Sequence, residues 1–396
     1  MSDLTQFLLA AAAFAVCVYA LFVASAAHHL RRRTPTLQCT AAPPVSLLKP
    51  LKGLEEDLEA CLASFFEQRY PGELELVFAT ATRDDPALAV ARRLSARYPG
   101  IATRFVLSDE NWGLNPKVSN LQGALSAAKY ELVLQTDANV RARPDYLARI
   151  VSEYQREDAS LLSSLIAGVG ERSLSAAMEN LQLTAYVAPA CCAALHVGGV
   201  PCVIGKSMLF RKSELRALGG LERVKDSLAE DFLLGRHYLA SGRRVVLSAT
   251  PILNVNVEMP LERSINRHAR WLKMRAVIHP SSFVADIFAN PVALAMLAAL
   301  SDGFGRHTTA ALFAVMALKV LGDSLLVRHV RGYAMAPQYT MWVPFKDLLM
   351  FGIWLYASVS RSVVWRGIRF RMGPDSQLLP DLGPLPVRVL RRLLSP

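Results

Sequence analysis

An uncharged, apolar run near the start of the chain, residues 4–27, constrains its fold more than any other feature. The run is long enough to cross a bilayer as one helix, since a span needs about 20 mostly apolar residues. Asp3 precedes the run and the basic stretch HHLRRR, residues 28–33, follows it. A cleaved signal peptide has the opposite order, with its basic residues first. The positive-inside bias therefore predicts a transmembrane anchor that leaves the next domain in the cytoplasm.

The composition agrees with a membrane protein, because 52% of the 396 residues are hydrophobic and only 19% are charged. The formal net charge is +11, but the basic residues gather beside apolar segments, in 31–33, 267–275 and 361–371. We therefore expect lipid head groups, and no nucleic acid, as the anionic partner. Six cysteines show no CxxC pair and no disulfide-like framework, which argues against a structural zinc site and an oxidised secreted scaffold.

Residues 45–247 alternate between strand and helix signals. We expect strands at 45–48, 74–80, 102–107 and 131–135, with helices at 54–67, 85–98 and 117–128 between or after them. This order predicts an α/β, Rossmann-like domain whose ligand site lies at the carboxyl ends of mostly parallel strands. The expected division is an anchor at 1–30, a linker at 31–44, the α/β domain at 45–280, membrane-embedded or re-entrant helices at 281–372 and a basic amphipathic tail at 373–396.

Acidic residues follow two of the expected strands. Asp84 and Asp85 come shortly after one strand, and Asp137 and Asn139 end another, so both groups should meet at one edge of the sheet. Asp137 is the leading ligand for a hard divalent cation, with Asn139 as a neutral oxygen donor. For the Asp84-Asp85-Pro86 segment a helix N-cap is the alternative interpretation.

Three further segments offer polar groups just after an expected strand or at a predicted helix start. Asn115 and Lys117 flank a proline there, which suits a phosphate oxygen, although an ordinary helix entry with a solvated lysine explains the pattern equally well. Lys49 and Lys52, which flank Pro50 just after the first expected strand, could likewise bind a phosphate oxygen or be ordinary solvated lysines. Asp231, next to Glu230, suits a general base that takes a proton from an acceptor hydroxyl, and an N-cap is again the alternative.

A basic run, Arg267-His268-Ala269-Arg270-Trp271, precedes the strongly hydrophobic C-terminal third. Arg267 and Arg270 are three residues apart, so one helix face presents both to a diphosphate, and Trp271 adds a flat apolar surface beside them. On this run alone, a juxtamembrane helix that holds anionic lipid is the favoured interpretation.

Taken in order, Asp85, Asp137, Asp231 and the Arg267–Trp271 run resemble the D, D, D, (Q/R)xxRW signature of inverting glycosyltransferases with the GT-A fold. The segments VSLLKPLKG (45–53), DDPA (84–87), NPK (115–117) and AEDF (229–232) are most similar to those of ceramide glucosyltransferases. Sugar polymerases share the signature, whereas LLKPLKG and NPK are more selective. The resemblance extends over nearly the whole chain.

The resemblance implies a role for each matching residue. Asp85, rather than its neighbour Asp84, would contact the uracil of a UDP-sugar, and Asp137 would hold Mg²⁺ or Mn²⁺ on the diphosphate. Asp231 would deprotonate the primary hydroxyl of a lipid acceptor. Arg267, Arg270 and Trp271 would bind the diphosphate and the acceptor region. Asn139 stands where many related enzymes have a second aspartate, which ceramide glucosyltransferases also tend to lack.

The C-terminal third contains three shorter or interrupted apolar stretches, at 287–300, 308–327 and 348–359. Three crossings would leave the basic residues 361–371 outside, so we expect two crossings and one re-entrant or interfacial segment. The leading hypothesis is glucose transfer from UDP-glucose to ceramide or a similar lipid alcohol. The alternatives are a hopanoid sugar transferase that uses UDP-N-acetylglucosamine and a non-catalytic membrane protein that binds nucleotide-sugar or lipid.

Overall fold

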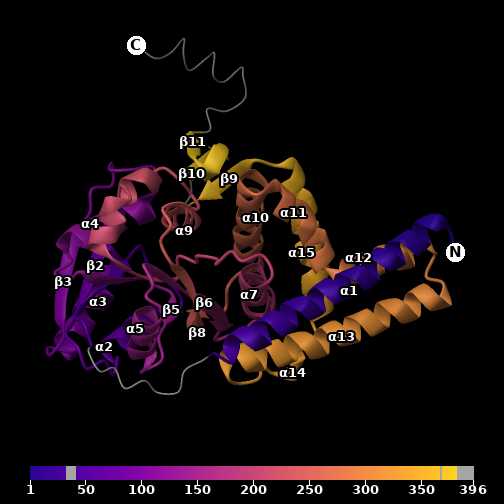
Figure 1. Cartoon of the computed structure of the whole chain (residues 1–396), viewed down its shortest axis with the longest axis horizontal. Helices are drawn as coiled ribbons and strands as arrows, with labels where there is room; N and C mark the ends of the chain where they lie inside the picture. Colours follow the sequence, from indigo (N-terminus) through magenta and orange to yellow (C-terminus); the bar gives the residue numbers. More distant parts are fainter. Residues whose placement is uncertain (33–41, 366–367, 381–396) are drawn as a thin grey trace, which may run out of the picture.

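The computed structural model describes residues 1–32, 42–365 and 368–380. Most of the expected linker (33–41) and of the expected basic tail (381–396) lies outside the described residues. An α/β domain occupies one end of the molecule, and long helices extend away from it (Figure 1).

In the described part of the chain, eight strands form one sheet in the order β3-β2-β1-β4-β7-β6-β8-β5. Their bounds are β1 Val45–Pro50, β2 Leu74–Thr80, β3 Ala102–Leu107, β4 Leu132–Thr136, β5 Val140–Arg141, β6 Leu161–Val169, β7 Ser207–Arg211 and β8 Val245–Val255. Strands β1 to β4 run parallel to one another, whereas β7 runs antiparallel to β4 and β6. The predicted α/β class with a parallel-rich sheet is confirmed.

Helices cover both faces of this sheet because its central strands are apolar on both sides. One face carries α2 (Leu58–Phe66), α3 (Pro86–Arg97) and α5 (Tyr146–Arg156), and the other carries α4 (Pro116–Ala127), α8 (Lys212–Ala217) and α9 (Glu230–Ala240). Successive side chains of β1 point to opposite faces of the sheet, so Leu47 packs in the core on the first face and Leu48 in the core on the second.

The strand directions bring the chemistry-bearing loops together. The carboxyl ends of β1, β2 and β4 share one edge of the sheet. Because β7 is antiparallel to β4, with Thr136 opposite Ser207, β7 begins at that same edge. The residues just before β7 therefore join those that follow the parallel strands.

Two helices are long and apolar enough to cross a membrane, α1 (Asp3–Leu30) and α13 (Arg306–Arg331), as judged over the described ranges. A third crossing is possible by length if α11 (Pro280–Ala285) and η3 (Asp286–Ala289) form one bent span with α12 (Pro291–Ser301) across a 67° bend. The bend coincides with Asn290, whose side chain caps α12, and with the proline that follows it. Helix α15 (Val343–Val359) has 17 residues. The predicted N-terminal apolar helix is confirmed.

Buried polar side chains join these helices. The Tyr19 hydroxyl on α1 donates to Asp323 on α13 over 2.8 Å, and Lys319 contacts the same carboxylate at 2.9 Å. Lys346 and Asp347 on α15 complete the cluster. The four charged side chains of this cluster are at most 8% exposed and face other helices. Lys319 and Asp323 thus give α13 a polar side toward its neighbours, whereas its outer surface is apolar.

After α15 the chain returns to the α/β domain. The strands β9 (Ser362–Trp365), β10 (Ile368–Met372) and β11 (Leu378–Pro380) form a small antiparallel sheet. The Leu228 side chain packs against Phe370 and Leu378, and the Leu378 N–H donates to the Asp226 carbonyl over 2.8 Å. The remaining elements are α6 (Leu174–Gln182), η1 (Leu183–Val187), α7 (Ala188–His196), η2 (Leu221–Val224), α10 (Leu261–Ile278), α14 (Pro337–Thr340) and η4 (Pro374–Ser376).

Candidate active site

Asp85 links two loops at the carboxyl edge of the sheet. Its Oδ1 accepts from the Ala87 N–H over 2.9 Å and so caps α3, as the N-cap interpretation predicts. Both of its oxygens also accept from the Gly53 N–H, each over 3.0 Å. Gly53 has a φ of 66°, which favours glycine at this turn. Asp84 is exposed, so Asp85 is the member of the pair that the fold holds in place.

Asn115 caps α4 and is fully buried. Its Oδ1 accepts from the N–H groups of Lys117 and Val118, and its Nδ2 donates to the Ser227 carbonyl over 2.8 Å. These bonds use both ends of the amide, so Asn115 positions the start of α4. Lys117 then extends into the site with only 16% of its side chain exposed, in contrast to a solvated lysine.

Asp137 carries an ammonium group on each carboxylate oxygen. Lys117 Nζ lies 3.0 Å from Oδ1, and Lys206 Nζ lies 2.9 Å from Oδ2. Burial acts to raise the pKa of Asp137, but the charges of the two lysines outweigh it and lower the pKa well below its usual range.

The pKa values of the two lysines that contact Asp137 shift in opposite directions. Burial acts to lower the pKa of Lys117, but Asp137, Glu230 and Asp231 together raise it. Burial lowers the pKa of Lys206. The Asp137 charge acts to raise this pKa, and the Arg267 charge lowers it further. Lys117 is therefore the more strongly held cation.

The residues predicted to bind a metal fit a divalent ion poorly in this arrangement. Besides its ion pair with Asp137, Lys206 donates to Oδ1 of Asn139 over 2.8 Å, so one ammonium holds both predicted ligands. Lys49 is fully buried, stacks over the Phe65 ring and donates to the Asp137 carbonyl over 2.9 Å. No cluster of three or more His, Cys, Asp or Glu side chains suited to a metal occurs among the described residues.

Asp231 lies in the first turn of α9 and does not cap it, because the cap position belongs to Ala229. Its Oδ2 accepts from the Gly205 N–H over 2.6 Å, and its Oδ1 accepts from the Phe232 N–H. The adjacent Glu230 pairs with Lys117 at 2.8 Å. Burial raises the pKa of Glu230, and Lys117 opposes the rise. Lys117 thus connects the α9 carboxylates to Asp137.

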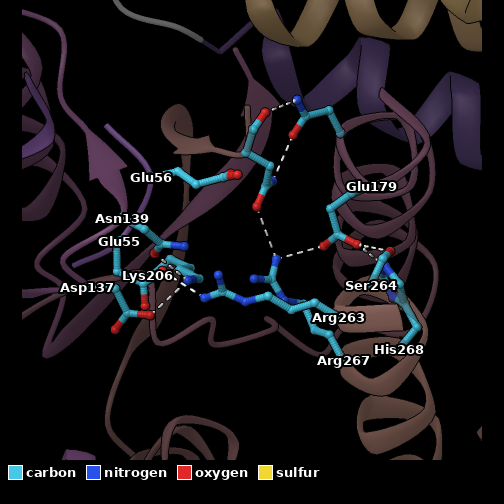
Figure 2. Close-up of polar contacts among 12 residues, drawn as sticks. Glu55, Glu56, Asp137, Asn139, Glu179, Lys206, Arg263, Ser264, Arg267 and His268 are labelled. Atoms are coloured by element: carbon cyan, nitrogen blue, oxygen red, sulfur yellow. Dashed lines mark hydrogen bonds and ion pairs between the residues drawn. The ribbon is translucent and has the colours of Figure 1, made fainter. Parts of the chain in front are cut away.

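Helix α10 supplies the facing wall. Arg267 is held by Glu179 at 2.8 Å and by Oδ1 of Asn256 at 3.3 Å, and Glu179 also accepts from His268 and Ser264. Figure 2 shows the Arg267 and Arg263 guanidinium groups reaching from α10 toward the side that carries Lys206 and Asp137. Arg263 pairs with Glu55 at 2.8 Å. The structure thus gathers Lys117, Asp137, Asn139, Asp231 and Arg267 around the edge of the sheet.

Trp271 packs against the core of the α/β domain and also lines a cavity that it shares with α15. Its ring meets that of His268 edge-on, with 5.4 Å between centroids. It lines a cavity of about 70 Å³, with Tyr186, Phe351 and Trp354 among the other walls. The polar lining groups include Asp286 and Asp347. His268 links this cavity to the charged site, because it lines the cavity and also contacts Glu179.

Sequence reasoning assigned no role to Lys206, Glu179 or Gly205. Gly205 and Lys206 directly precede β7, and the antiparallel direction of that strand, which brings Lys206 to Asp137, has no local signal in the sequence. Glu179 lies 88 residues from Arg267. Glu179 is the one charged residue of α6, and a single charge in a helix of otherwise uncharged residues is a signal that could have marked it.

Comparisons with known proteins agree on one class. Ceramide glucosyltransferase 1 of Caenorhabditis elegans is 27% identical over 372 residues, which cover 89% of this chain and 78% of that protein. Ceramide glucosyltransferase 3 of the same organism is 24% identical over 379 residues, with 93% and 81% covered.

Among solved structures, a mannosyltransferase from Pyrobaculum calidifontis in complex with GDP-Man and Mn²⁺ is similar at 18% identity and a TM-score of 0.46, over 88% of this chain and 99% of that one. TarS 1-349 of S. aureus in complex with UDP-GlcNAc gives 14% and 0.40, over 85% and 99%. The model of glycosyl transferase family 21 matches residues 10–378, nearly the whole described chain, and the protein belongs to that family.

Proposed function

We propose that the protein transfers glucose from UDP-glucose to the primary hydroxyl of ceramide at the cytoplasmic face of a membrane. The observation that carries this proposal is the place of Asp231. Its carboxylate accepts from the Gly205 N–H at the carboxyl edge of the sheet and lies near Lys117, which pairs with Asp137. The named relatives are ceramide glucosyltransferases, which supports the lipid and the sugar.

In the proposed reaction Asp231 takes the proton of the acceptor hydroxyl as the oxygen attacks C1 of glucose. The bond from C1 to the UDP oxygen breaks, and UDP leaves with its electron pair. Attack from the face opposite UDP inverts the anomeric configuration. Arg267 and Arg270 would stabilise the charge that develops on the diphosphate, because fixed cations are most effective where charge appears in the transition state.

Asp85 would orient the uracil, since its carboxylate is fixed by Gly53 and the start of α3. Lys117 would contact the donor from the edge of the sheet, and Asn115 would hold the helix start that carries it. Mg²⁺ or Mn²⁺ at Asp137 and Asn139, expected from the sequence, would polarise the diphosphate. Because Lys206 engages both side chains, we assign no step to a metal.

The proposed orientation places residues 45–280 in the cytoplasm. The return of β9–β11 to the Leu228 region supports an even number of crossings between α10 and β9, because both then lie on one side of the membrane. The bent α11–α12 segment and α13 would make these two crossings, with α15 at the interface.

Purified protein in nanodiscs should be incubated with UDP-glucose or UDP-N-acetylglucosamine and with ceramide, diacylglycerol or a bacteriohopane acceptor, and the products identified by mass spectrometry. We expect glucosylceramide. Asp231→Asn should abolish transfer while UDP binding persists. Glu157→Gln, in a surface ion pair with Arg244, is the matched carboxylate control and should remain active. Product from the hopanoid acceptor alone would replace ceramide as the substrate.

A further inference from the structure

A lysine ammonium stands between the two residues that the sequence marks as metal ligands. Lys206 Nζ lies 2.9 Å from Oδ2 of Asp137 and 2.8 Å from Oδ1 of Asn139. Its side chain is 17% exposed, so it is part of the wall of the site rather than a surface lysine. The other carboxylate oxygen of Asp137 faces Lys117 at 3.0 Å. A divalent ion at Asp137 would have to displace an ammonium or lie beside it against strong repulsion.

The backbone fixes Lys206 in this place. Strand β7 pairs with β4 so that Thr136 lies opposite Ser207, and the Asp137 N–H donates to the Lys206 carbonyl over 3.4 Å. Lys206 and Asp137 are thus neighbours across a strand pair. The strand pairing holds the two backbones side by side, and the Lys206 side chain spans the remaining distance to the carboxylate.

The Lys206 ammonium keeps capacity for a ligand. An ammonium group has three N–H donors, and the contacts found among the described residues, to Asp137 and Asn139, account for two. Arg267 is held by Glu179 at 2.8 Å and belongs to α10, the helix that faces Lys206 across the site (Figure 2). Each cation is held in place by a carboxylate, Lys206 by Asp137 and Arg267 by Glu179, and a diphosphate has the charge and the oxygens to accept from two such fixed cations at once.

We infer that Lys206 is a donor-binding residue whose ammonium takes the place of a divalent cation at Asp137 and meets the diphosphate of UDP together with Arg267. The inference rests on the proposed UDP-sugar donor. It assigns to Asp137 a different task from metal binding, which is to hold and orient Lys206. The expected consequence is UDP binding that depends on Lys206 and only weakly on divalent metal.

UDP binding to the full-length protein in nanodiscs should be measured calorimetrically, once with EDTA and once with Mn²⁺. Wild-type affinity should change less than about 3-fold between the two buffers. Lys206→Met should lose roughly 10-fold or more in EDTA, the loss of one charge-assisted hydrogen bond, and recover with Mn²⁺. Lys206→Arg should keep binding in EDTA. Lys129→Met, a half-exposed lysine paired with Glu73, is the control and should match the wild type.

Mn²⁺ binding gives a readout independent of the nucleotide. Electron paramagnetic resonance of free Mn²⁺ should show tighter binding to Lys206→Met than to the wild type, and Asp137→Asn in the Lys206→Met background should remove the gain. Wild-type UDP binding that requires Mn²⁺, or equal Mn²⁺ affinity in the two proteins, would overturn the role of Lys206 alone. Wild type that binds no UDP in either buffer would overturn the proposed donor as well. Melting curves show whether Lys206→Met folds. If it does not, UDP binding by Lys206→Arg in EDTA tests the inference instead.

Discussion

Gly205 donates its backbone N–H to the Asp231 carboxylate across 2.6 Å, one residue before Lys206. A single turn before β7 therefore positions both the proposed base and the ammonium at Asp137. The close approach requires a residue without a side chain, because a Cβ on Gly205 would lie 2.8 Å from Oδ2 of Asp231 and 3.1 Å from Nζ of Lys117. The position of the Asp231 carboxylate therefore depends on a glycine at position 205.

Replacing Gly205 with alanine should displace the Asp231 carboxylate and lower kcat by about 100-fold, the order expected when a reacting group moves by ~1 Å. Transfer of radiolabelled glucose to ceramide measures the effect. Gly100→Ala is the control, since a Cβ there meets nothing within 4 Å. Full activity in Gly205→Ala would show that the Asp231 position tolerates the shift.

Asp85→Ala should weaken both the fold and donor binding. The change removes the α3 cap, which costs about 1 kcal/mol, and frees the Gly53 turn. We expect a melting temperature lower by a few degrees and UDP affinity reduced roughly 10-fold. Asp84→Ala, an exposed neighbour, should change neither quantity. Equal effects of the two substitutions would contradict the assignment of Asp85.

Local sequence signals identified the first half of the sheet well. The strands at 74–80 and 102–107 have the predicted bounds, because each follows a Pro-Gly pair and contains β-branched and aromatic residues that favour a strand. Element bounds and site contacts were predicted less well where residues far apart in the sequence determine them. The helix expected at 54–67 begins at Leu58, since Asp57 adopts a φ of 54° before it. Lys206 reaches Asp137 only through antiparallel pairing, and Arg267 reaches Glu179 only through the packing of α10 against α6. Neither contact leaves a periodic pattern in the chain.

Asp323→Ala should destabilise the helical part of the protein strongly. It leaves the buried Lys319 ammonium and the Tyr19 hydroxyl without their shared acceptor. Breaking a buried ion pair by removing one partner costs roughly 3–5 kcal/mol. Thermal melting in detergent should shift down by several degrees. Leu321→Ala tests the outer face of the same helix, where the side chain is 66% exposed, and should shift the midpoint far less. Similar shifts for both variants would refute a stabilising role for the cluster.

The Glu179 carboxylate should make stability depend on pH in a defined direction. Burial acts to raise its pKa, but the charges of His268 and Arg267 outweigh burial and lower the pKa well below 4.5. A carboxyl with a lowered pKa in the folded state stabilises the protein above its unfolded pKa and loses that contribution as the pH falls. Glu179→Gln should therefore melt lower than the wild type at pH 7 and pH 5.5, and the difference should shrink below about pH 4.5. Melting curves at pH 7, 5.5, 4.5 and 3.5 measure it. The exposed Glu262→Gln on α10 provides the control, with a difference near zero throughout. A Glu179→Gln deficit that stays constant or grows at low pH would mean that lost packing, rather than lost charge, explains the destabilisation.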